Sequence, residues 1–152
     1  MHKLYFAYGA NTNQYEMQYR CPHAEPLGVV SINDHRLVFR GVADVEPIEG
    51  GIVRGALWSI TKECEAALDI FEGFPTLYTK AYFHLNWSGR DRQVMLYIMR
   101  SDWGYSPPSE GYRDTIAEGY SQFGIKERQL TEAVAHAQRV GRAGTGPRRR
   151  WG

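Results

Sequence analysis

The chain has 152 residues, 43% of them hydrophobic, so it is long enough for one domain with a buried core. Its formal net charge is +1 and no apolar run reaches the ~18–20 residues of a membrane span, so the composition favours neither nucleic acid nor a membrane as a partner. Two cysteines, Cys21 and Cys64, are too few for a disulfide framework and fit a reducing, cytoplasmic compartment.

The first strand is predicted at "KLYFAY", which carries apolar side chains on both faces and therefore suits the middle of a sheet. Gly9 ends it and can take a positive φ. Asn11 or Asn13 can then cap a helix, and Glu16, three residues after Asn13, is the capping-box partner. This helix is predicted to stop near "RCP".

Two short strands, "LGVVSI" and "RLVFRG", are predicted on either side of the turn-like cluster "NDH". The segment "GVADVEPIEGG" is predicted as a loop. In the next strand, "IVRGALWSI", Gly55 indicates a bulge or a close backbone approach.

A helix over "KECEAALDIFE" is predicted to begin after Thr61 and to stop at Gly73. Two further strands form a hairpin around "SGRD", and two helices follow, one capped by Ser109 and one over "KERQLTEAVAHAQRV". The pattern predicts an α+β fold with a small mixed or barrel-like sheet and flanking helices. We expect a single domain over residues 1–140, followed by a basic, glycine-rich tail over residues 141–152.

The loop "YGANTN" is the first candidate site. A glycine turn from a strand into a helix leaves the first helical N–H groups without intrahelical partners, and these groups attract a carboxylate or phosphate. The alternative is an ordinary tight turn. The chain has neither the G-K-[ST] of a P-loop nor a G-x-G-x-x-G fingerprint, and its histidines lack the spacing of zinc ligands.

Glu72 is the second candidate, because it is predicted on the last turn of its helix, where the helix dipole disfavours a carboxylate. The dipole and burial would both raise its pKa, which suits proton transfer near neutral pH. The alternative is a solvated glutamate without a role. Asp69, one turn earlier, is expected to face water.

Taken in order, the motifs resemble the γ-glutamylcyclotransferase family, including its AIG2-like and γ-glutamylamine cyclotransferase branches. "YFAYGAN" resembles the family's strand and Y-G-S-N-type loop, with Ala10 where the family often has serine. "GGIVRGALW" resembles its glycine-containing strand, and "LDIFEGFP" its glutamate–glycine helix end. The family has three tyrosines after this glutamate, and they are matched here by Tyr78, Tyr97 and the Tyr112 of "PPSEGYRDT".

The resemblance implies a cavity at one end of the fold and no cofactor or metal. It implies Glu72 as the catalytic acid and base. It also implies a set of substrate-binding residues, namely Tyr8, Gly9, Ala10, Asn11, Tyr78, Tyr97 and Tyr112.

The implied activity is release of 5-oxoproline from a γ-glutamyl amine or γ-glutamyl amino acid, by attack of the substrate's α-amine on its own γ-carbonyl. The expected partner is this small molecule, and the expected assembly is a monomer or weak homodimer. Two alternatives stay open: a non-catalytic binding module on the same fold, and an enzyme that transfers or releases a γ-glutamyl group carried by another molecule.

Overall fold

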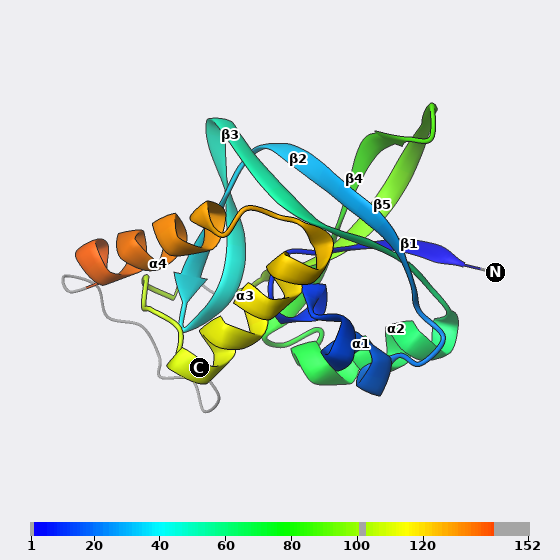
Figure 1. The fold of residues 1–152 in the computed structure, drawn as a ribbon, viewed down its shortest axis with the longest axis horizontal. Helices are drawn as coiled ribbons and strands as arrows, with labels where there is room; N and C mark the ends of the chain where they lie inside the picture. Colours follow the sequence, from blue (N-terminus) through cyan, green and yellow to red (C-terminus); the bar gives the residue numbers. More distant parts are fainter. Residues whose placement is uncertain (1, 101–102, 142–152) are drawn as a thin grey trace.

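The computed structural model describes residues 2–100 and 103–141, and most of the expected basic tail lies outside these residues. One mixed sheet runs in the order β2-β3-β1-β5-β4, with β1 parallel to β5 and the other neighbours antiparallel. The strands are β1 Lys3–Ala7, β2 Glu25–Arg40, β3 Val42–Ile60, β4 Tyr78–Trp87 and β5 Arg90–Met99. The fold is α+β as expected, but the sheet is open, so "barrel-like" describes it only loosely (Figure 1).

The central strand β1 separates two hydrophobic clusters. Leu4 and Phe6 belong to one cluster, whereas Tyr5 and Ala7 belong to the other, because successive side chains of a strand point to opposite faces. The helices α3 (Glu110–Phe123) and α4 (Arg128–Val140) supply buried residues to the first cluster. The helices α1 (Gln14–Arg20) and α2 (Lys62–Glu72) supply the second and lie together in Figure 1.

The hairpin of β2 and β3 differs from the prediction. The segments expected as two strands form one strand that runs through "NDH", and the expected loop "GVADVEPIEGG" is the first half of β3. The turn consists of Gly41 alone between the two strands. Asn33 pairs with Ile52 and His35 pairs with Pro47, so residues 48–51 of β3 form a bulge opposite Asp34. This bulge explains why the sequences of both strands contain turn-like residues at this point.

The helix ends follow their capping residues. Asn13 accepts hydrogen bonds from the N–H groups of Tyr15 and Glu16 at the start of α1. The expected capping box is wrong, because the Glu16 carboxylate pairs with Arg20 instead. Thr61 caps α2 as predicted. The predicted stop at Gly73 is confirmed, with φ at 66°, a left-handed conformation that glycine adopts without a steric cost.

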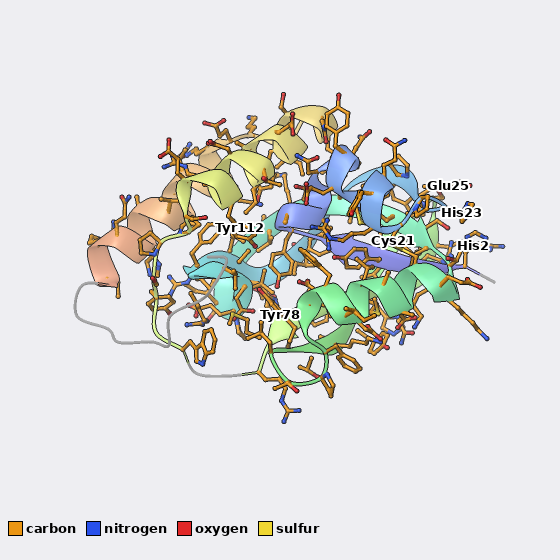
Figure 2. All side chains as sticks on the ribbon, turned by 90° about the horizontal axis from the view of Figure 1, so that it is seen from below. His2, Cys21, His23, Glu25, Tyr78 and Tyr112 are labelled. Carbon is orange, nitrogen blue, oxygen red and sulfur yellow. A yellow bond between two sulfur atoms is a disulfide. The ribbon has the colours of Figure 1, made fainter. Side chains whose placement is uncertain are left out.

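A disulfide joins Cys21 and Cys64, a cross-link that the sequence did not predict. Cys21 follows the last residue of α1 and Cys64 lies in the first turn of α2, as Figure 2 shows for Cys21. Both residues are buried in the second cluster. The bond therefore fixes the end of α1 against the start of α2.

We expect the double variant Cys21→Ala/Cys64→Ala to lose about 2–4 kcal/mol of unfolding free energy, because it removes a cross-link that restricts the unfolded chain. Urea unfolding of the oxidised parent and the variant measures this difference. The bond does not form if thiol titration of the unfolded parent, without reducing agent, finds two free thiols, and if the parent and the double variant have equal free energies of unfolding.

Candidate functional site

The loop after β1 is held rigidly from three sides. It forms a short 3₁₀ turn, η1 (Ala10–Thr12), in which the Thr12 hydroxyl donates to the carbonyl oxygen of Gly9 at 2.7 Å. The indole N–H of Trp58 donates to the carbonyl oxygen of Asn11 at 3.0 Å. Helix α3 crosses η1 so closely that a Cβ atom on Gly119 would collide with Thr12. The loop is thus positioned by β3 and α3 as well as by β1.

Gly9 is required for space. Its φ is −122°, so the expected positive φ is wrong. A Cβ atom at Gly9 would lie 3.0 Å from the Cβ of Ala43 and 3.4 Å from the Tyr112 hydroxyl. The glycine therefore lets the loop approach β3 and α3.

One pocket collects every residue that the sequence singled out for binding or catalysis. Four come from the end of β1 and the loop after it, Glu72 from the end of α2, and three tyrosines from β4, β5 and α3. The complete lining is Tyr5, Tyr8, Gly9, Ala10, Asn11, Ala43, Phe71, Glu72, Tyr78, Tyr97 and Tyr112. In Figure 2, Tyr78 lies near the end of α2 and Tyr112 lies beside α3. Packing of distant segments, and not sequence proximity, creates this site.

The pocket is narrow and adjoins a wider recess. Its cavity volume is about 20 Å³, which is room for about one water molecule. The recess has a volume of about 220 Å³ and shares Ala10, Phe71 and Tyr112 with the pocket. Larger grooves of about 520 Å³ and 880 Å³ lie beside α4 and between β2 and β4, and neither contains a residue that the sequence singled out. The small pocket, and not the larger grooves, is therefore the place where the polar groups expected at a site converge.

Several pocket tyrosines form hydrogen bonds to backbone groups through their hydroxyls. Tyr8 donates to the carbonyl oxygen of Tyr97 and Tyr78 donates to that of Ala43, both at 2.6 Å. The Tyr112 hydroxyl instead accepts from the N–H of Ala43 at 3.2 Å. These bonds fix the tyrosine rings as the walls of the cavity. Tyr78 is thereby fixed as one wall of the pocket.

Asp69 does not simply face water, which corrects the expectation from sequence. Its carboxylate accepts a hydrogen bond from the Tyr97 hydroxyl at 2.6 Å and pairs with Lys80 at 3.1 Å. Burial and this hydrogen bond to Asp69 raise the pKa of Tyr97, so its hydroxyl stays protonated. Asp69 thus supports a wall of the pocket from the α2 side.

Sequence reasoning missed three residues of the lining: Tyr5, Ala43 and Phe71. Tyr5 and Phe71 lie in apolar stretches where an aromatic residue signals core packing, and Ala43 lies in the segment expected to be a loop. The proximity of Tyr5 and Ala43 to Glu72 follows only from the tertiary fold, whereas Phe71 directly precedes Glu72 in the sequence. Within residues 2–100 and 103–141, no three His, Cys, Asp or Glu side chains are grouped as metal ligands, and no helix is long and apolar enough to cross a membrane.

The fold and pocket together define a small α+β protein whose tyrosine-lined cavity has a carboxylate in its wall and a glycine loop at its edge. The chain belongs to the family described as γ-glutamyl cyclotransferase, AIG2-like, whose model matches residues 5–120. No protein of curated function matches the sequence significantly.

Solved structures share this fold at low sequence identity. A structure titled γ-glutamyl cyclotransferase has a TM-score of 0.78 at 22% identity, with 95% of this chain and 100% of that chain covered. An uncharacterised human protein has a TM-score of 0.75 at 24% identity, covering 87% and 86%. YkqA from Bacillus subtilis has a TM-score of 0.74 at 18% identity, covering 91% of this chain but 55% of its own.

We expect Gly9→Val to destabilise the protein by about 1–3 kcal/mol, because its branched side chain would be forced against Ala43 and Tyr112 in a packed site. Ala10→Ser is the control, since it adds one small polar atom on the neighbouring residue and should unfold at nearly the parent's urea concentration. Equal stability of Gly9→Val and the parent would mean that the loop has room that the structure does not show.

Proposed function

We propose that this protein is a cyclotransferase that releases 5-oxoproline from a γ-glutamyl amine or γ-glutamyl amino acid. Membership of the γ-glutamyl cyclotransferase family supports an enzyme that acts on γ-glutamyl compounds. The observation that supports the proposal most is that Glu72 and the seven expected binding residues line one pocket, although they come from five separate parts of the chain.

The reaction needs no cofactor, because the nucleophile and the electrophile belong to one molecule. The protein folds the γ-glutamyl chain so that its α-amine approaches the γ-carbonyl carbon. The new C–N bond closes a five-membered ring, and the original amide C–N bond then breaks. The products are 5-oxoproline and a free amine or amino acid.

Glu72 is the proton carrier in this proposal. Its carboxylate takes a proton from the substrate's α-ammonium group, which frees the nitrogen lone pair for attack. It later gives a proton to the leaving nitrogen, so the enzyme returns to its starting state. Gly9, Ala10 and Asn11 line the pocket. In this proposal their backbone N–H groups hold the substrate's carboxylate or its γ-carbonyl oxygen.

The pocket must widen when substrate enters. A γ-glutamyl group is larger than the single water that about 20 Å³ admits. The pocket and the outer recess share Phe71 and Tyr112. The recess is therefore the adjoining space for the leaving group in this proposal.

We expect Glu72→Gln to lower the turnover number for 5-oxoproline formation by about 10²–10⁴-fold, because glutamine fills the same space but does not carry a proton. The melting temperature should stay equal or rise, since the change removes a negative charge from the negative end of α2. Chromatographic detection of 5-oxoproline from a panel of γ-glutamyl amines and amino acids measures the first effect, and calorimetry the second.

Glu63→Gln is the matched control, because Glu63 is an exposed residue in the first turn of the same helix. Asp69→Asn is unsuitable, since Asp69 bonds to the pocket residue Tyr97. A Glu72→Gln rate within about tenfold of the parent would rule out Glu72 as the proton carrier. Binding of γ-glutamyl compounds without turnover by the parent would support the binding-module alternative.

A further inference from the structure

The Tyr5 hydroxyl, like that of Tyr112, accepts a hydrogen bond from the protein. Tyr5 lies on β1, is 3% exposed, and lines the pocket beside Glu72. Its ring packs edge-on against that of Tyr97, with ring centroids 5.9 Å apart. Tyr8, Tyr78 and Tyr97 all donate their hydroxyl protons to oxygen atoms of the protein.

The Tyr5 hydroxyl oxygen, by contrast, is a hydrogen-bond acceptor. The side-chain nitrogen Nδ2 of Asn11 lies 3.0 Å from the Tyr5 hydroxyl oxygen, and an amide nitrogen can only donate a hydrogen bond. The orientation of the Asn11 amide follows from its other end, where Nη1 of Arg20 donates to Oδ1 at 2.9 Å. A guanidinium group has no acceptor, so the amide oxygen must face Arg20 and the amide nitrogen must face Tyr5. The hydroxyl proton of Tyr5 therefore points away from Asn11.

Arg20 is itself held in place. Its Nη2 donates to the Glu16 carboxylate at 2.7 Å, and its guanidinium lies 3.5 Å from the centroid of the Phe71 ring. The Arg20 side chain is 14% exposed, which limits competition from water. The contacts with Glu16 and Phe71 thus fix Arg20, which in turn fixes the Asn11 amide.

The Tyr5 hydroxyl also keeps its proton. Burial, followed by the negative charge of Glu72, raises the pKa of Tyr5 far above its ordinary value. A neutral phenol whose oxygen accepts from the Asn11 amide still has a proton to donate into the pocket. In the proposed reaction, the γ-carbonyl oxygen is the substrate atom that gains negative charge as the α-amine adds to the carbon.

We propose that Tyr5 donates a hydrogen bond to the γ-carbonyl oxygen of the substrate, and that Arg20 positions Tyr5 through Asn11. This inference rests on the proposed function. Tyr5 forms no covalent bond and loses no proton. Its hydrogen bond strengthens while the carbonyl oxygen is negatively charged and weakens again when the amide C–N bond breaks. Tyr5 is thus a catalytic residue, and Arg20 is a positioning residue.

The first experiment compares Tyr5→Phe with the parent in steady-state formation of 5-oxoproline. We expect the turnover number to fall about 100-fold, as for removal of one oxyanion donor, and KM to change less than about threefold, because the bond acts mainly in the transition state. Tyr105→Phe is the matched control. It also removes a hydrogen-bonded hydroxyl, which bonds to Glu46, but Tyr105 does not line the pocket. It should retain the parent's turnover number.

The second experiment tests whether Arg20 acts through Tyr5. Arg20→Gln should lower the turnover number in the parent background, and Arg20→Lys should recover part of it. In the Tyr5→Phe background, Arg20→Gln should have no further effect, because there is no hydroxyl left to orient. A merely structural role for Arg20 would give the same fractional loss in both backgrounds.

Each result has a separate meaning. An active parent whose Tyr5→Phe variant is equally active overturns the role of Tyr5 and leaves the proposed function intact. An Arg20→Gln loss that persists in the Tyr5→Phe background overturns the positioning role of Arg20. A parent that makes no 5-oxoproline from any γ-glutamyl compound overturns the proposed function, and the role of Tyr5 in it falls as well.

Discussion

The pairing of β1 with a strand on each side is the interaction on which the rest of the structure depends. β1 pairs with β3 over its whole length and with β5 at Tyr5 and Met95, and so joins the β2–β3 hairpin to the β4–β5 hairpin. Its alternating side chains enter both hydrophobic clusters. Its end delivers the glycine loop to the pocket. One short strand thus sets the sheet, the two cores and one wall of the site.

The other walls of the pocket owe their positions to contacts outside it. The Asp69 carboxylate of α2, which pairs with Lys80 of β4, accepts a hydrogen bond from the Tyr97 hydroxyl. Ala43 of β3 bonds to the hydroxyls of Tyr78 and Tyr112. The tyrosine walls are held by hydrogen bonds to other parts of the fold, so their positions are set by the tertiary structure. Glu72 is the last residue of α2, directly before Gly73, and it lines the pocket.

Local signals predicted the helices well, because a helix begins and ends through contacts between residues close in sequence. Thr61, Gly73 and Ser109 are examples, and the α+β class followed from the order of elements. The long β2–β3 hairpin was not predicted from the sequence. The residues around its register shift, at Asp34 on β2 and at 48–51 on β3, are of types that are typical of turns. The disulfide joins residues 43 positions apart, and no local pattern encodes that contact. The site was predicted as a set of residues through family motifs, whereas Tyr5 and the Asp69–Tyr97 bond required tertiary structure.

The bulge in β3 has a consequence for how the chain tolerates cutting and insertion. Residues 48–50 are exposed and lie opposite the register shift, away from the residues that line the pocket. Cys21 lies before this bulge in the sequence and Cys64 after it. A protease cut at the bulge would therefore leave two fragments that stay covalently joined, separate only after reduction, and still present both halves of the sheet. The same position suits an inserted affinity tag or fluorophore, because its residues are exposed and stand outside the paired register of the two strands.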